Sequence, residues 1–365
     1  MINIGFAGDC CISGKYLDNF QTGIQIFSDE VIEDIESCDF VVVNFEGPET
    51  ERYNHLRKEI RVANPIGAVE YLAARNIRIF NLANNHIFDC GAEGFLDTKQ
   101  TIEKYSCDYF GAGENIQEAS EIHYIEKDGI RIALIGIAQK EGMSAGNKKP
   151  GVFCEDDYAK FINRIKEAKK KSDWVILNYH GGEELSVYPS TLKRRILKKY
   201  AMVDGIDIVI AHHSHVLQGF EQINGKYIFY SLGNFILNVG LHNSFPETKT
   251  GGFLKISFSR TNFNIDLKMI ESDHAKGIIN FRTSDEYLKT ICDFAKLKTK
   301  WLNESFKIIF MERDLEEIHH DNEYIGRDKR NLLSRIFYIA THKYLLSTYL
   351  NAYFAKFLKT VKLLD

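Results

Sequence analysis

Ile77-Arg78-Ile79-Phe80-Asn81-Leu82 runs directly into Ala83-Asn84-Asn85-His86, so a short apolar segment ends in amide and imidazole side chains. Four further apolar runs end in the same manner, at residues 2–7, 40–43, 174–177 and 206–210. Each run is rich in Val and Ile and is continuous rather than alternating. This pattern predicts short strands that are buried on both faces.

Segments with helical composition separate these runs. The predicted helices are Ser28–Glu36, Pro65–Arg75, Ala92–Tyr105, Glu155–Lys170 and Ser190–Tyr200. Strands that alternate with helices predict an α/β fold with its functional residues at the carboxyl ends of the strands. A hairpin over residues 122–126 and 130–137 and strands over 227–230 and 253–258 complete two packed sheets with helices outside.

Composition excludes several classes of protein. Of the 365 residues, 44% are hydrophobic and 26% are charged, and the net charge of −4 does not favour nucleic acid as a partner. The seven cysteines form no CxxC pair, which indicates reduced thiols in a cytosolic compartment. Residues 1–6 resemble no secretory signal. We therefore expect a cytoplasmic protein.

The amino-acid composition of the chain changes after about Asp273. Residues 286–310 and 331–364 lack Pro and Gly and are helical in composition, so we predict one domain over 1–270 and a helical C-terminal extension over 271–365. The tail is basic and rich in Tyr, Phe and Leu. It predicts a helical element that packs on the core or on a second copy of the chain, or that lies peripherally on a membrane surface.

The polar ends of the five runs supply ligands for metal ions. A pair of ions that activates water needs a bridging carboxylate, terminal carboxylate and imidazole ligands, and a neutral oxygen donor. Suitable side chains are Asp9, Glu46, Asn85, His180, His213 and His215. The ends of parallel strands meet at one edge of a sheet, so we expect these side chains to converge there.

Several motifs together resemble the CapA family of poly-γ-glutamate capsule biosynthesis proteins, a branch of the calcineurin-like metallophosphoesterase superfamily. The motifs are Gly8-Asp9, Asn44-Phe45-Glu46, Leu82-Ala83-Asn84-Asn85-His86 with Asp89, His180-Gly181-Gly182-Glu183-Glu184, His213-Ser214-His215 and Ser231-Leu232-Gly233-Asn234-Phe235. The resemblance covers residues 1 to about 260. It implies a four-layer α-β-β-α sandwich over residues 1–270.

The resemblance also implies a role for each ligand. Asp9 and His215 would bind a first metal ion, and Glu46 would bridge to a second ion bound by Asn85, His180 and His213. The expected ions are two divalent metals, Mn, Fe or Zn, which suit oxygen and imidazole ligands.

The same resemblance assigns proton transfer and its support. His86 would be catalytic by protonating the leaving oxygen, and Asp89 would support it. Glu184 would not bind a metal ion itself but would orient the imidazole of a ligand. Asn234 lies in the last motif without a role.

Three positions depart from the family pattern. Cys11 stands where the superfamily commonly has a His, and it is either a soft ligand or, as we favour, a buried structural thiol. His212 precedes the paired histidines and is either a metal ligand or, as we favour, a residue that packs against or supports the ligands. Gly181 replaces a usual Trp, which would widen the pocket.

The favoured function is metal-dependent hydrolysis of a small or polymeric anionic ester, most simply a phosphoester. Arg57, Lys58 and Arg61 either contact such an anion or form a solvated face of the protein. One alternative is cleavage or formation of a γ-glutamyl amide at the same site. Another is a non-catalytic component of a polymer-synthesis assembly, docked through its C-terminal helices.

Overall fold

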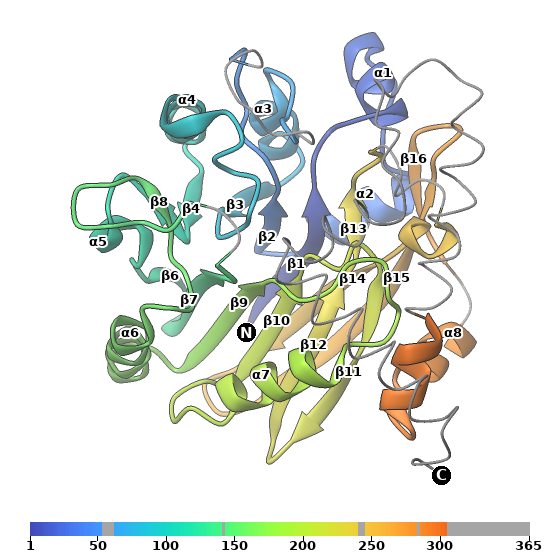
Figure 1. Ribbon diagram of the computed structural model, residues 1–365. Coiled ribbons are helices and arrows are strands. Elements are labelled where there is room, and N and C mark those ends of the chain that lie inside the picture. The colour runs from blue at the N-terminus through green and yellow to red at the C-terminus, as the bar shows by residue number, and fades with distance from the viewer. Residues whose placement is uncertain (53–61, 141–142, 240–244, 283–284, 305–365) are drawn as a thin grey trace, which may run out of the picture. The chain divides into compact units, whose positions relative to one another are not determined.

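The computed structural model describes residues 1–52, 62–140, 143–239, 245–282 and 285–304. The chain divides into two compact units, Met1–Ala295 and Lys296–Asp365, and the first unit holds both sheets (Figure 1). The predicted domain boundary after residue 270 falls inside strand β15 (Phe263–Asp273). Most of the predicted extension over 271–365, including the basic tail, lies outside the described residues.

The first sheet has eight strands in the order β16-β15-β14-β1-β2-β3-β4, and β13 also pairs with β1. Parallel pairing joins β1, β2, β3 and β4, whereas β14, β15 and β16 are antiparallel. The strands are β1 (Ile2–Cys10), β2 (Phe40–Phe45), β3 (Ile77–Asn81), β4 (Asp108–Phe110), β13 (Asn234–Ile236), β14 (Thr250–Phe258), β15 and β16 (Ile278–Phe281).

The second sheet has six strands in the order β11-β12-β10-β9-β7-β6. Its centre, β12-β10-β9-β7, is parallel, and an antiparallel hairpin partner lies at each edge. The strands are β6 (His123–Lys127), β7 (Ile130–Ala138), β9 (Trp174–His180), β10 (Ile208–His212), β11 (Leu217–Ile223) and β12 (Lys226–Leu232). β5 (Ala112–Gly113) and β8 (Gly151–Val152) form a separate short pair.

Alternation along the buried strands creates the layers. Val42 of β2 and Ile176 of β9 belong to the apolar cluster formed by both sheets. Their neighbours Val43 and Leu177 face the opposite sides and pack in two outer clusters with helices. Both faces of each sheet are therefore covered, and the predicted four-layer α-β-β-α sandwich is confirmed (Figure 1).

The helices lie on the outer faces of the sheets. α1 to α4 contribute to the cluster on the first sheet, and α6 and α7 to that on the second. The helices are α1 (Lys15–Thr22), α2 (Asp29–Glu36), α3 (Ala68–Ala73), α4 (Gly91–Lys104), α5 (Ile116–Ala119), α6 (Tyr158–Lys171), α7 (Thr191–Ala201) and α8 (Asp285–Ile291). The five helices predicted within residues 28–200 are all present, although α3 is shorter than predicted.

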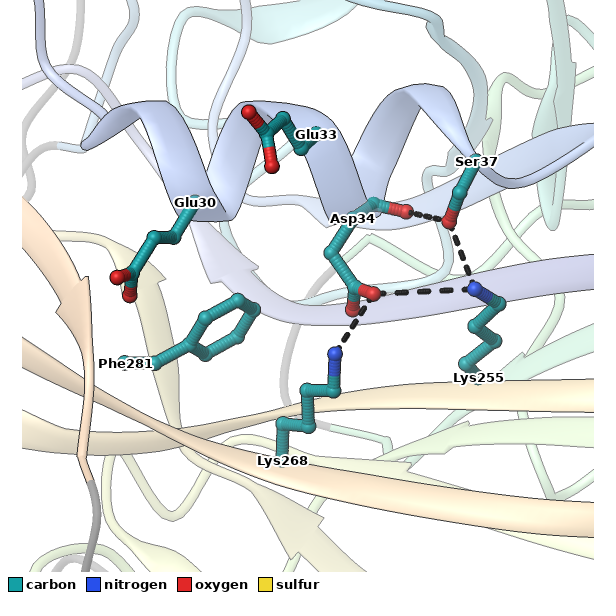
Figure 2. Close-up of a pocket in the computed structure, with 7 residues that line it drawn as sticks. All are labelled: Glu30, Glu33, Asp34, Ser37, Lys255, Lys268 and Phe281. Carbon is teal, nitrogen blue, oxygen red and sulfur yellow. Dashed lines mark hydrogen bonds and ion pairs between the residues drawn. The ribbon is translucent and has the colours of Figure 1, made fainter.

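A hollow of about 420 Å³ lies between α2 and the antiparallel strands of the first sheet (Figure 2). Asp34 pairs with both lysines of the wall. Lys268 Nζ lies 2.7 Å from Asp34 Oδ1, and Lys255 Nζ donates to Ser37 Oγ at 2.7 Å. Figure 2 draws no ion pair for Glu30 or Glu33, so the wall also carries acidic groups beside the paired lysines, and we assign the hollow no function.

Candidate metal centre

The structure brings the six predicted ligands together. They extend from five strand ends: Asp9 in β1, Glu46 after β2, Asn85 after β3, His180 at the end of β9, and His213 and His215 after β10. The expectation that one sheet edge supplies all of them is wrong, because β9 and β10 belong to the second sheet. The ligands still meet because the two sheets pack face to face, so strand-end loops from both sheets reach the same place.

Asn85, His180 and His213 surround one point. Asn85 Oδ1 lies 2.9 Å from His180 Nε2, which lies 3.1 Å from His213 Nδ1. Ligand atoms bound to one ion at about 2.0–2.2 Å lie about 3 Å from one another. The spacing of these three atoms therefore fits a shared cation.

Asp9, Glu46 and His215 form the second half of the centre. One ligand atom from each lies within 4.8 Å of the other two. His215 Nδ1 is 3.4 Å from Asp9 Oδ2, and His215 Nε2 is 3.8 Å from Glu46 Oε1. These separations leave room for an ion between the carboxylates and the imidazole.

Glu46 provides the sharpest test of whether the residues fit a metal. Its side chain is fully buried, and neither carboxylate oxygen has a hydrogen-bond partner within the described part of the chain. Burial of an unpaired carboxylate is costly unless it binds a cation or holds a proton. The donor set around Glu46 consists of oxygen and imidazole groups, which suit a hard or borderline divalent ion. The residues therefore fit the implied metal pair.

Burial and like charges shift the pKa values of the ligands. Burial raises the pKa of Asp9 to about 7, although hydrogen bonds from the His213 backbone and the Asn44 side chain oppose it. Burial, Asp9 and other nearby carboxylates raise the pKa of Glu46 well above its usual value. Burial and neighbouring imidazoles hold the pKa of His180 well below its usual value. Neutral imidazoles are the form that binds metals, and a cation would relieve the repulsion between the carboxylates.

His86 is positioned beside the ligands rather than among them. Its Nδ1 lies 2.7 Å from Asp89 Oδ2, and its Nε2 lies 3.7 Å from Glu46 Oε1. Asp89 is fully buried and also accepts a hydrogen bond from the Val62 backbone at 3.1 Å. A fixed carboxylate holds one nitrogen of the ring and directs the other toward the centre. The roles of His86 and Asp89 remain predictions with suitable geometry.

A network of buried amides beneath the centre was not predicted. Asn44 Nδ2 donates to Asp9 Oδ1 at 2.8 Å and lies 3.2 Å from His180 Nδ1, and Asn81 Nδ2 donates to Asn44 Oδ1 at 2.9 Å. Asn234 Oδ1 lies 3.0 Å from His215 Nδ1, which gives this residue of the last motif an orienting contact. An amide inside an otherwise apolar strand end is the sequence signal that points to such a network.

The turn that carries His213 and His215 has an unusual backbone. Both residues have positive φ angles, 87° and 56°, which cost of the order of 1–3 kcal/mol each for residues other than glycine. Ser214 between them is fully buried, and its carbonyl accepts a hydrogen bond from the Leu185 backbone at 2.8 Å. Such a conformation persists only where the surroundings fix it.

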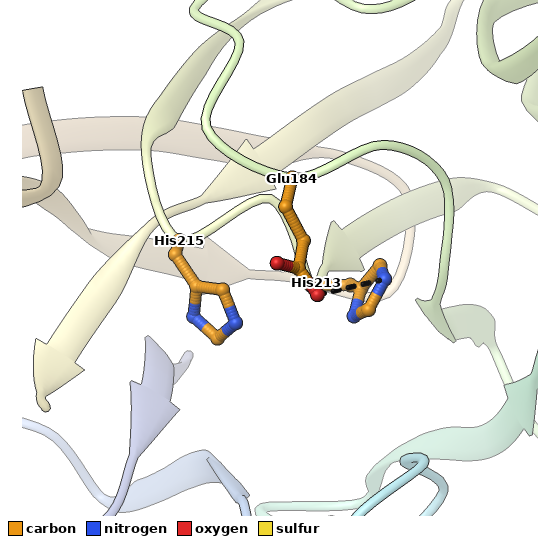
Figure 3. Close-up of side chains that lie close together, drawn as sticks. All are labelled: Glu184, His213 and His215. Atoms are coloured by element: carbon orange, nitrogen blue, oxygen red, sulfur yellow. Dashed lines mark ion pairs between the residues drawn. The ribbon is translucent and has the colours of Figure 1, made fainter. Parts of the chain in front are cut away.

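Glu184 lies beside the same turn, with its carboxylate close to the rings of His213 and His215 (Figure 3). Its Oε1 is 3.8 Å from His213 Nε2, and its side chain is 41% exposed. Ligand atoms of Glu184, His213 and His215 lie within 4.8 Å of one another. The separation is longer than a hydrogen bond, so the orienting role of Glu184 remains a prediction, and its carboxylate is accessible to solvent.

Comparison with known proteins identifies the family. The profile of the bacterial capsule synthesis protein PGA_cap family matches residues 3–239, which is more than half of the chain. The chain belongs to this family.

Two proteins similar to this chain come from Bacillus. The PGA biosynthesis protein CapA of Bacillus subtilis (strain 168) is 36% identical over 248 residues, which cover 66% of this chain and 64% of the relative. The capsule biosynthesis protein CapA of Bacillus anthracis is 36% identical over 216 residues, which cover 56% and 52%. The matched region thus spans less than two thirds of either relative.

Among solved structures, the calcineurin-like phosphoesterase YfkN from Bacillus subtilis matches with a TM-score of 0.39 and 15% sequence identity. The match covers 87% of this chain and 98% of that one. Similarity of this degree carries no information about activity.

The structure also locates the departures from the PGA_cap pattern. The Cys11 thiol is buried with Val62 and Leu237 and donates to the Ala63 carbonyl at 3.4 Å, as expected for a structural thiol. His212 is buried, with its Nδ1 3.9 Å from Asp9 Oδ1, and burial lowers its pKa to about 3. A neutral ring suits packing and metal binding alike, and Nδ1 has no hydrogen-bond partner within the described residues, so the packing role of His212 remains a prediction.

The structure does not test the remaining predictions for this PGA_cap chain. Arg57, Lys58 and Arg61 lie outside the described residues. None of the helices in the described part combines the length and apolar character needed to cross a membrane. Cytoplasmic location, peripheral membrane contact and oligomer contact remain predictions.

Proposed function

We propose that the protein is a metal-dependent hydrolase of an anionic ester, most simply a phosphoester, that serves capsule or envelope polymer biosynthesis. The observation that carries this proposal is the fully buried Glu46 carboxylate without a hydrogen-bond partner in the described chain, surrounded by five further ligand side chains. Asp9, Glu46 and His215 would hold one divalent ion. Glu46, Asn85, His180 and His213 would hold the other. Membership of the PGA_cap family supports the biological setting.

A bound pair of divalent ions would supply the positive charge that stabilises the displacement and lowers the pKa of the attacking water. The protein's own residues would do the rest. His86 would donate a proton from Nε2 to the leaving oxygen, while Asp89 holds Nδ1 at 2.7 Å and fixes the orientation of the ring. Asn44 holds Asp9 and His180, and Asn234 holds His215, in the orientation needed to bind the ions.

Amide hydrolysis or formation is the second candidate, favoured by Glu184. Its half-exposed carboxylate lies beside His213 and adds negative charge, which raises the pKa of both Asp9 and Glu46. A carboxylate at that position repels a phosphate dianion but accepts a hydrogen bond from an amide N–H. The relatives named for PGA biosynthesis agree with such a substrate.

The two candidates predict different substrates. Protein purified without chelator and loaded with Mn²⁺ is expected to hydrolyse one or more members of a panel of phosphorylated metabolites. A γ-glutamyl polymer should remain intact under the same conditions. Glu46→Gln protein, prepared identically, controls for contaminating phosphatases and should be inactive. Cleavage of the polymer without ester hydrolysis would select the amide reaction, and inactivity toward both by a protein with two bound ions would favour an assembly role.

A further inference from the structure

Helix α7 contains a lysine that the proposed chemistry does not use. Lys193 lies in the first turn of α7 and is only 2% exposed. The buried residues of the helix are Lys193, Leu197, Tyr200 and Ala201, so a cationic side chain occupies the apolar stripe. Lysine is rarely buried unless its ammonium group has a specific partner.

The partner of Lys193 is the turn between two predicted metal ligands. Its Nζ donates to Ser214 Oγ at 2.7 Å, and both side chains are buried. The lysine stem packs against the loop after β9, where a Cβ at Gly182 would come within 2.5 Å of Lys193 Cδ. Gly182 also has a φ of 110°, so the loop requires glycine here for two reasons.

Ser214 is therefore held from two directions. The Leu185 N–H fixes its carbonyl at 2.8 Å, and Lys193 fixes its hydroxyl. The residues on either side, His213 and His215, are those with positive φ. Burial lowers the pKa of Lys193 to about 8, against the attraction of the Glu183 and Asp9 carboxylates.

We propose that Lys193 is a positioning residue of the centre: its ammonium group anchors Ser214 and thereby keeps His213 and His215 in the left-handed backbone conformation that directs their imidazoles at the ligand cluster. This inference rests on the proposed metal centre for its functional meaning. The anchor itself is a property of the metal-free protein.

The test compares Lys193→Met, which keeps the stem and removes the ammonium group, with Ser214→Ala and the double variant. Lys199→Met is the matched control, because Lys199 is an exposed lysine of the same helix. Amide hydrogen exchange of a peptide covering 212–216 is measured in metal-free protein, and Mn²⁺ and Zn²⁺ affinities are measured by competition titration. Amide exchange of this peptide is expected to be about 10-fold faster or more in Lys193→Met and in Ser214→Ala than in wild type. Metal affinity should fall by roughly 10–100-fold.

The double variant should lose no more affinity than either single variant, since both substitutions break one contact. The proposal would be overturned if a folded Lys193→Met or Ser214→Ala protein kept the amide exchange rates and the metal affinity of wild type. It would also be overturned if the double variant lost as much affinity as the two single variants added together. If Lys193→Met does not fold, Ser214→Ala decides by the same two measurements. Failure of the wild-type protein to bind either ion would refute the proposed function, while the exchange data would still decide the role of Lys193.

Discussion

Replacing Glu46 by glutamine is expected to abolish binding of the metal pair and all metal-dependent activity, yet to stabilise the metal-free protein. The substitution keeps the shape of the side chain but removes the charge shared between the two ion positions. In the metal-free state that charge is buried, close to Asp9, and without a hydrogen-bond partner in the described residues. Loss of function with a gain of stability is the behaviour of a site whose charges are arranged for a ligand.

The pH dependence follows from the raised pKa of Glu46. A carboxyl group with a higher pKa in the folded than in the unfolded protein retains its proton preferentially in the folded state. Its contribution to stability is thus present below the unfolded value of about 4.5 and is lost as pH rises toward the folded pKa. Glu46→Gln protein lacks this loss. Its free energy of unfolding should therefore exceed that of wild type by an amount that grows between pH 5 and pH 8 and reaches about 1–3 kcal/mol.

Urea denaturation in the presence of EDTA at both pH values measures this difference. Glu49→Gln is the matched control, because Glu49 is also buried but accepts hydrogen bonds from the Gly67 and Val69 backbones at 2.8 and 2.7 Å. Burial raises the pKa of Glu49 as well, but glutamine replaces one accepting oxygen by an NH₂ group that faces a backbone N–H, so this substitution should destabilise the protein at pH 5. A Glu46→Gln protein that is less stable than wild type at pH 8, or that still binds two ions, would contradict the account of the site.

Asn85 and His86 are expected to respond differently to substitution although they are neighbours. Asn85→Ala removes the oxygen that lies 2.9 Å from His180 Nε2, so it should empty the second ion position and remove activity with it. His86→Ala should retain both ions, because His86 Nδ1 is held by Asp89 at 2.7 Å and its Nε2 lies 3.7 Å from Glu46 Oε1, beyond hydrogen-bond distance. Its rate should fall by roughly 10²–10⁴-fold, the usual contribution of general acid catalysis.

The loss in His86→Ala should shrink for a nitrophenyl ester, whose leaving group needs little protonation. The measurement requires one substrate with a poor leaving group, one with a good leaving group, and metal analysis of each variant. Equal losses on both substrates with both ions retained would remove the general-acid assignment. Loss of metal from His86→Ala would place the ligand at position 86 instead of 85.

The sequence predicts the strand ends of the site well because continuous Val- and Ile-rich runs mark strands buried on both faces. It does not show which sheet each run joins, since sheet membership depends on long-range pairing such as that of β1 with β14. Helix α1 was not predicted, because it is short and buries only Tyr16 and Asn19. Strand β15 was also missed, although Phe263, Ile265, Leu267 and Met269 alternate with polar residues along it.

Side chains that support the ligands were harder to predict than the ligands themselves. Asn81 ends an apolar strand and carries no metal-binding signature of its own. Its role depends on its contact with Asn44 in the neighbouring strand. Lys193 stands among other basic residues of α7, and only its place in the buried stripe distinguishes it. Such residues act through geometry that several distant segments create together.

The central claim is tested most directly by a crystal structure of the protein purified without chelator and soaked in Mn²⁺, with anomalous scattering to locate the ions. The account predicts two Mn²⁺ ions roughly 3.5–4 Å apart. Glu46 should bridge them, with Asp9 and His215 on one ion and Asn85, His180 and His213 on the other. A single ion, or two ions that do not share Glu46, would contradict the dinuclear centre.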